Sequence, residues 1–136
     1  MKILILYDGT LHAKKALNYG IDTIGRSKGE LLLLQVFDRS SFVDYDAGPA
    51  AEDAARAEKA GHLEWAKHYL QEKAPDLPVR IIREEGDAVS LAVHHAAAEQ
   101  VDLLLVPPAF RSARAAASCP VRIIPGPILV PLDSSG

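Results

Sequence analysis

The stretch VDLLLVPPAFRSARAAAS, residues 101–118, points to the fold and raises the question of function. Its consecutive apolar residues Leu103 to Val106 are typical of a strand buried inside a parallel sheet. Proteins of that class often follow such a strand with a glycine-rich turn whose backbone binds phosphate. This chain has Pro107 and Pro108 there instead. The turn therefore poses the question of whether a nucleotide site has been lost or was never needed.

Other apolar runs of the same kind occur along the chain. They are short, largely continuous and separated by helical patterns, and we expect strands at 2–7, 30–37, 79–84, 102–107 and 127–132. Helices are expected after the turn at 8–10, over 50–74 and from 87 to about 99, with a weaker helical region at 110–118 and a short turn through 120–124. This alternation predicts one doubly wound α/β sandwich over residues 1–136.

Capping residues mark the expected helix ends. Thr10 and Asp87 are suitable N-cap residues, because their side-chain oxygens can accept from the free backbone N–H groups of a first helical turn. Pro75 is expected to end the helix that precedes it.

The composition excludes several classes of protein. The 136 residues suit one domain with a sizeable core, and the net charge of −3 argues against a nucleic-acid or anionic-membrane surface. No apolar run approaches the ~20 residues of a membrane span. The single Cys119 cannot form an internal disulfide, which fits a cytoplasmic location. We therefore expect neither a nucleic-acid partner nor a membrane partner.

A ligand of such a sheet is expected beyond the carboxyl ends of the strands. Three segments converge there in the predicted fold: residues 8–10, 36–38 and 107–118.

The chain resembles the universal stress protein family. The resemblance rests on YDGTLHAKKAL (7–17), REEGDAVSLAVHHAAAEQVDLLLV (83–106) and GPILV (126–130), which follow one another in the family's order. It implies a Rossmann-like, five-stranded parallel sheet, a cytoplasmic role in stress responses and a homodimer that pairs through the last strand, here 127–132. Many members of the family bind ATP. In those members an Asp after the first strand and a Val near the end of the second hold the adenine, and Asp8 and Val36 match these positions.

The family's glycine-rich phosphate loop is not matched. Its first two glycine positions fall on Pro107 and Phe110, and its final Gly-Ser falls on Ala117 and Ser118. Proline lacks an N–H, and Phe110 adds bulk where the backbone should approach phosphate. Losing two charge-assisted hydrogen bonds, each worth roughly 1.5–3 kcal/mol, would weaken binding by ~10²-fold or more. The sequence therefore predicts a degenerate nucleotide site that does not bind ATP tightly.

If a nucleotide does bind, the candidate residues form a short set: Asp8, Thr10, Val36, Val106, Arg111 and Ser118. ATP or AMP is then the cofactor. Asp8 also has a purely structural interpretation, in which its carboxylate caps the turn before the first helix. Both interpretations stay open on the sequence alone.

Other reactive residues suggest no catalytic site. The five histidines include no pair at the i, i+4 spacing of a helical zinc site. Cys119 has no identifiable partner base, and Trp65 and Tyr69, four apart, suggest a packing edge. We therefore expect no metal, no catalysis and no bound cofactor.

The sequence thus favours a dimeric, cytoplasmic regulatory module of the stress response that acts through an unidentified protein partner. The alternative is an ATP- or AMP-binding switch with slow or no hydrolysis. An adenylyl-transfer enzyme is a third option, but it needs a glycine-rich loop after the first strand, where only Gly9 is present.

Overall fold

The structure is a computed structural model of the chain, and it describes residues 1–25, 28–38 and 48–124. Strands and helices alternate along these residues, as the sequence predicts. In chain order they are β1 (Lys2–Leu6), α1 (Leu11–Ile24), β2 (Glu30–Phe37), α2 (Gly48–Lys73), β3 (Val79–Glu85), α3 (Ala88–Ala98), β4 (Leu103–Val106), the 3₁₀ helix η2 (Pro108–Phe110), α4 (Ala113–Ala116) and β5 (Val121–Ile123).

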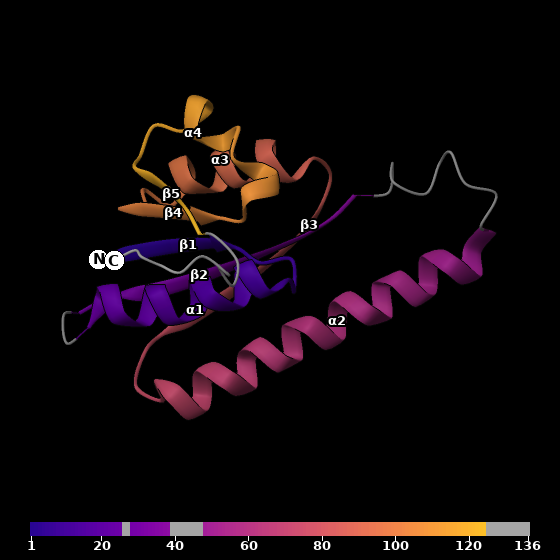
Figure 1. Cartoon of the computed structure of the whole chain (residues 1–136), viewed down its shortest axis with the longest axis horizontal. Helices are drawn as coiled ribbons and strands as arrows, with labels where there is room; N and C mark the ends of the chain where they lie inside the picture. Colours follow the sequence, from indigo (N-terminus) through magenta and orange to yellow (C-terminus); the bar gives the residue numbers. More distant parts are fainter. Residues whose placement is uncertain (26–27, 39–47, 125–136) are drawn as a thin grey trace, which may run out of the picture.

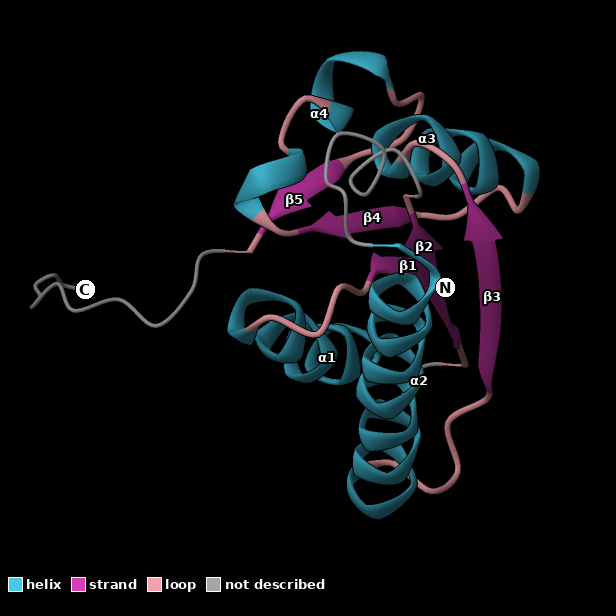
Figure 2. Cartoon of the chain, turned by 90° about the vertical axis from the view of Figure 1, so that its right-hand side faces the viewer, coloured by secondary structure: helices cyan, strands magenta, loops and turns pink. Residues whose placement is uncertain are grey.

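The strands form one five-stranded sheet in the order β3-β2-β1-β4-β5, and every neighbouring pair is parallel. Figure 1 shows α1 and α2 on one face of this sheet and α3 and α4 on the other, and the turned view in Figure 2 agrees. The expected doubly wound, Rossmann-like α/β/α fold is confirmed. From β1 the chain adds β2 and β3 on one side and then β4 and β5 on the other, so the strand order reverses between β1 and β4. A ligand is expected at the carboxyl ends of these two strands.

The core is divided by the sheet into two apolar layers. Alternate residues of a strand point to opposite faces, so Ile3 and Ile5 pack toward α1 and α2 while Leu4 and Leu6 pack toward α3 and α4. The apolar residues of β1 and β2 and most of those of β4 are buried almost completely, whereas the edge strands β3 and β5 are partly exposed. Because β1, β2 and β4 are covered on both faces of the sheet, their sequences are continuous apolar runs and do not alternate between apolar and polar residues.

The predicted helix starts are confirmed by their hydrogen bonds. The Thr10 hydroxyl accepts from the backbone N–H of Ala13 at 3.3 Å, and the Asp87 carboxylate accepts from the N–H of Ser90 at 2.8 Å. Hydrogen bonds from the backbone N–H and from the side chain of Ser90 lower the pKa of Asp87 below its usual range, because they stabilise its charged form. Each helix therefore begins where its capping residue predicts.

The helical turn expected at 120–124 is wrong, because Val121–Ile123 form strand β5. These residues pair in parallel with Leu104 to Val106, and the backbone N–H of Leu104 donates to the carbonyl of Pro120 at 3.0 Å. The free edge of β4 therefore pairs with a segment that contains two β-branched residues, Val121 and Ile123, and that the local sequence pattern had predicted to be a turn. The strand expected at 127–132 lies outside the described residues.

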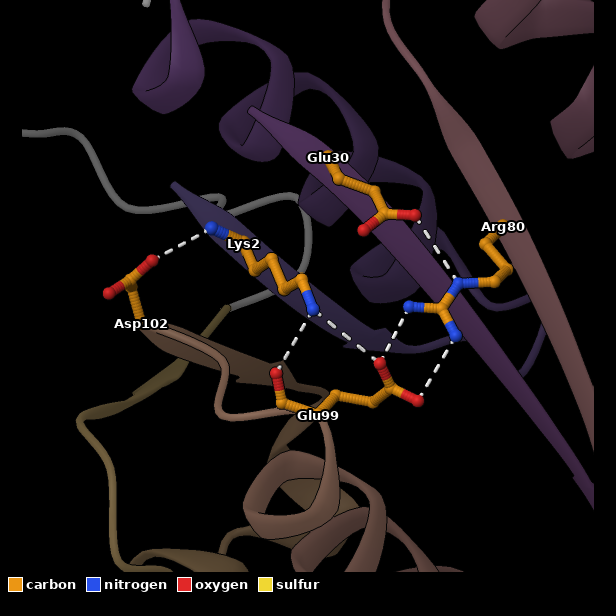
Figure 3. Close-up of polar contacts among 5 residues, drawn as sticks. All are labelled: Lys2, Glu30, Arg80, Glu99 and Asp102. Carbon is orange, nitrogen blue, oxygen red and sulfur yellow. Dashed lines mark hydrogen bonds and ion pairs between the residues drawn. The ribbon is translucent and has the colours of Figure 1, made fainter. Parts of the chain in front are cut away.

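Charged side chains join the amino ends of the strands, at the edge opposite the expected ligand position (Figure 3). Arg80 of β3 donates to both carboxylate oxygens of Glu99 at 3.0 and 2.6 Å, and to Glu30 of β2 at 3.3 Å. The ammonium of Lys2 lies 3.6 Å from Glu99, and the backbone N–H of Lys2 donates to Asp102 at 2.8 Å. This cluster ties three strand starts to the end of α3.

Candidate functional site

A crevice of about 390 Å³ lies at the carboxyl ends of β1 and β2. Asp8 and Val36, the two residues matched to adenine binding, both line it. Phe110 of η2 closes one side of the crevice, and α2 supplies another wall through Ala55, Glu58, Lys59 and His62. The crevice therefore lies at the carboxyl edge of the sheet, on the β2 side of the position between β1 and β4 where the topology predicts a ligand, and Phe110 connects it to the segment after β4.

The turn after β1 positions Asp8. One Asp8 carboxylate oxygen accepts from the backbone N–H of Thr10 at 3.0 Å and from its hydroxyl at 2.6 Å. Gly9 between them has a φ of +81°, in the left-handed region that favours glycine. Asp8 thus organises the turn and lines the crevice at once, so its structural role does not exclude a ligand role.

The His62 side chain lies against this turn. A β-carbon placed on Gly9 would come within 2.2 Å of His62 Nδ1, so glycine at this position lets α2 approach the turn closely. His62 Nδ1 is buried and has no hydrogen-bond partner. The hydroxyl of Tyr7, another crevice residue, is also buried and unpartnered. Burial, reinforced by the charge of Asp8, raises the pKa of Tyr7 to about 12, so Tyr7 stays neutral and able to donate.

The segment after β4 is folded into short helical turns. Within it the N–H of Phe110 donates to the carbonyl of Pro107 at 3.0 Å, and the N–H of Arg111 donates to that of Pro108 at 3.2 Å. The N–H groups of residues 114, 115 and 117 are bonded in the same local way. Pro107 and Pro108 have no N–H at all. Most backbone donors that a phosphate would need are therefore absent or already used.

The charges that line the crevice are mostly negative. Asp8, Asp38 and Glu58 contribute carboxylates, and Lys59 is the one lysine or arginine among the described residues that line it. A triphosphate placed there would meet like charges at close range, which costs free energy.

The remaining candidate nucleotide residues do not line this crevice. Thr10 is exposed and caps α1, and Val106 is fully buried in the layer beneath α3. Arg111 and Ser118 are exposed and do not line the crevice. The structure thus brings Asp8 and Val36 together, and it does not bring the other four to the same cavity.

A second depression, of about 640 Å³, lies beside the crevice beyond Phe37. The guanidinium of Arg56 stacks over the Phe37 ring at 4.1 Å and pairs with Glu85 at 3.1 Å and Glu52 at 3.3 Å. The side chain of Gln35 donates to the carbonyl of Lys59 at 2.6 Å. Arg56 is one of three cationic residues that line this depression, and its two carboxylate partners make it less available to an anion.

The wall formed by α2 was missed at the sequence level. The buried stripe of α2 contains Leu63, Ala66 and Leu70. Extending that stripe towards the start of α2 by helical steps of three and four reaches His62 and Lys59. The helical periodicity therefore indicates that both residues face the sheet. The polar character of His62 and Lys59 hides this signal, because a buried stripe is recognised by its apolar residues.

Metal and membrane features are not found in the described residues. No group of three His, Cys, Asp or Glu side chains in residues 1–25, 28–38 and 48–124 could hold a metal ion. Over the same residues, no helix combines the length and the apolar character needed to span a bilayer.

Burial raises the pKa of Cys119, which disfavours its thiolate.

Comparisons with known proteins agree with the architecture. A model of the Universal stress protein family matches residues 1–116. Among solved structures, universal stress protein UspA from Lactobacillus plantarum superposes with a TM-score of 0.74 at 19% identity, covering 91% of this chain and 97% of that one. A family protein from Burkholderia pseudomallei gives 0.71 at 24% identity, covering 92% and 96%. A family protein from Arabidopsis thaliana, solved with AMP bound, gives 0.69 at 20% identity, covering 98% and 97%. No curated protein matches the sequence.

Proposed function

Because the chain belongs to the universal stress protein family, we propose that it is a regulatory module of the stress response that does not bind ATP tightly. It works in the cytoplasm as a homodimer, through its surfaces and without catalysis. The observation that carries this proposal is the segment 107–117. Its two prolines and its locally bonded N–H groups leave few donors for phosphate.

The crevice supports the same conclusion. Phe110 occupies its rim, and three carboxylates face it against one lysine. Bound phosphate needs the opposite arrangement, in which backbone donors and cations surround the anion. The crevice is large enough for a small organic molecule, and its charge favours one without phosphate groups.

The homodimer is part of this proposal. Among the described residues β5 pairs only with β4, so its other edge is open to a strand of a second copy. The segment expected to pair across the dimer, 127–132, lies outside the described residues. Sedimentation over a wide protein concentration range tests the dimer, and a monomer mass at every concentration would refute it.

Titration calorimetry at near-physiological salt tests the nucleotide part of the proposal. The purified protein is titrated with Mg–ATP, ADP and AMP in parallel. We expect no saturable heat from Mg–ATP up to about 1 mM. The triple variant Pro107→Gly/Pro108→Gly/Phe110→Gly is the matched gain-of-function test, because it returns two N–H groups and opens the rim. Micromolar binding of ATP by the unaltered chain would refute the proposal.

One observation favours a second candidate function, an AMP- or ATP-binding switch with slow or no hydrolysis. Asp8 and Val36 line the same crevice, and the similar Arabidopsis protein was solved with AMP. In this case AMP gives micromolar heat in the calorimeter, and Asp8→Asn weakens it. Arg111→Ala then tests whether an exposed side chain has replaced the missing backbone donors.

A further inference from the structure

A shallow depression of about 170 Å³ lies between α1 and α2, apart from the crevice. We call it the Trp65 surface; its lining residues are Leu11, Lys14, Lys15, Asn18, Trp65 and Tyr69. The residues Leu11 and Trp65 are 59% and 42% exposed. They are two of only three large apolar residues that are exposed in the described parts of the chain. Exposed apolar residues that gather in one place mark contact surfaces more often than scattered ones do.

The aromatic residues of this surface are held in place. The rings of Trp65 and Tyr69 stack with centroids 5.0 Å apart and planes 11° apart. The Tyr69 hydroxyl donates to the side-chain oxygen of Asn18 at 2.5 Å, which joins α2 to α1. The ammonium of Lys14 lies 4.4 Å from the centroid of the Trp65 ring. A partner would therefore meet rings that are already positioned, and little conformational entropy is lost on binding.

The charge at this surface is opposite to that of the whole chain. Lys14 and Lys15 line the depression, and the ammonium of Lys73 lies 5.9 Å from the centroid of the Tyr69 ring. No carboxylate is among the described lining residues, although the chain has a net charge of −3. A basic spot on a chain with net negative charge is a local site of attraction for an acidic partner.

We propose that the Trp65 surface docks an acidic segment of a partner protein that carries an aromatic or large aliphatic side chain. The apolar side chain packs against Leu11 and Trp65, and flanking carboxylates face Lys14. Tryptophan and tyrosine are the residue types that most often dominate protein interfaces. Single-stranded nucleic acid also combines negative charge with flat rings. It suits this chain less well, because nucleic-acid binders carry a broad basic footprint and this chain is acidic.

Trp65 is the only tryptophan in the chain, so its fluorescence reports on this surface alone. The probe is a labelled random copolymer of glutamate and tyrosine, with polyglutamate and oligo-deoxythymidine as comparators. Anisotropy of the label gives the affinity, and selectively excited Trp65 emission shows where the probe binds. We expect the copolymer to shift the Trp65 emission and to bind at least about tenfold more tightly than either comparator.

Two variants and one control locate the contact. Lys14→Glu and Leu11→Ser should each weaken copolymer binding about tenfold, by charge repulsion and by loss of apolar contact respectively. Arg114→Glu makes the same charge change as Lys14→Glu but lies on α4, on the other face of the sheet, and should leave the affinity unchanged.

Four results would overturn the proposal. An unchanged Trp65 emission, or equal affinity for polyglutamate, would show that no aromatic contact is made here. Tighter binding of oligo-deoxythymidine would assign the surface to nucleic acid. An equal loss of affinity in Arg114→Glu and Lys14→Glu would show that only net charge matters.

Discussion

Gly9→Ala tests the close approach of α2 to the turn that positions Asp8. Gly9 has a φ of +81°, and a residue with a β-carbon in the left-handed region costs about 1–2 kcal/mol of folding free energy. The new β-carbon would also lie 2.2 Å from His62 Nδ1, so the imidazole must move. Overpacking of this kind typically costs about 1–3 kcal/mol. The two effects together predict a loss of about 2–5 kcal/mol.

Urea unfolding followed by circular dichroism measures this loss. For a chain of 136 residues, 1 kcal/mol corresponds to roughly 3–5 °C in Tm, so Gly9→Ala should lower the Tm by ~6–25 °C. Gly61→Ala is the matched control, because a β-carbon there meets nothing within 4 Å. Gly61 lies inside α2, and alanine at that position should stabilise the protein by about 0.5–1 kcal/mol.

A double-mutant cycle separates the two causes. In a His62→Ala background the steric contact is gone, so Gly9→Ala should cost only the backbone part, about 1–2 kcal/mol. The coupling free energy between the two positions should then be about 1–3 kcal/mol. An equal cost of Gly9→Ala in both backgrounds would refute the contact with His62. A loss below about 0.5 kcal/mol would refute the argument from backbone strain as well.

Three further predictions concern stability. Leu17→Ala removes a fully buried side chain of α1 that packs toward the sheet and should cost about 2–5 kcal/mol in the free energy of unfolding; a loss under about 1 kcal/mol would contradict the packing. Thr10→Ala removes the N-cap of α1 and should cost about 0.5–2 kcal/mol, whereas Thr10→Ser should be nearly neutral, and equal losses would show that the cap is not responsible. The hydrogen bond from Arg80 lowers the pKa of Glu99 below its ordinary 4.5. A carboxylate whose folded pKa is depressed contributes stability above its unfolded pKa and loses it as pH falls through the folded pKa. Acid unfolding of the Arg80→Gln variant should therefore show a weaker pH dependence below about pH 4.5 than that of the unaltered chain, and identical pH profiles would argue against the ion pair.

The crevice could be predicted from the sequence only in part. Asp8 and Val36 follow from their places at two strand ends, because parallel strands bring their carboxyl ends to one edge. The helical periodicity of α2 places His62 on the side that faces the sheet, but its close contact with Gly9 could not be predicted. The position of the His62 ring depends on the angle at which α2 crosses the sheet and on how closely the helix approaches Gly9. Neither quantity can be inferred from residues that are neighbours in the sequence.

The Trp65 surface shows the same limit. The spacing of Trp65 and Tyr69 places both on one side of α2, and the sequence suggested a packing edge. Packing against α1 decides how much of that side is covered, and it leaves Trp65 42% exposed beside Leu11 and Lys14. Exposure is a property of the assembled layers, so the helix periodicity alone cannot determine it.

The sequence by itself determined the elements whose causes are local. Strand β2 runs over the predicted residues 30–37. Its continuous apolar sequence is typical of a strand that is covered on both faces. Thr10 and Asp87 begin their helices because capping bonds span only three residues. Tertiary structure alone decided that Val121–Ile123 is a strand and that Arg80 meets Glu99. Both depend on partners distant in sequence, the free edge of β4 and the end of α3, and such contacts form only when the sheet assembles.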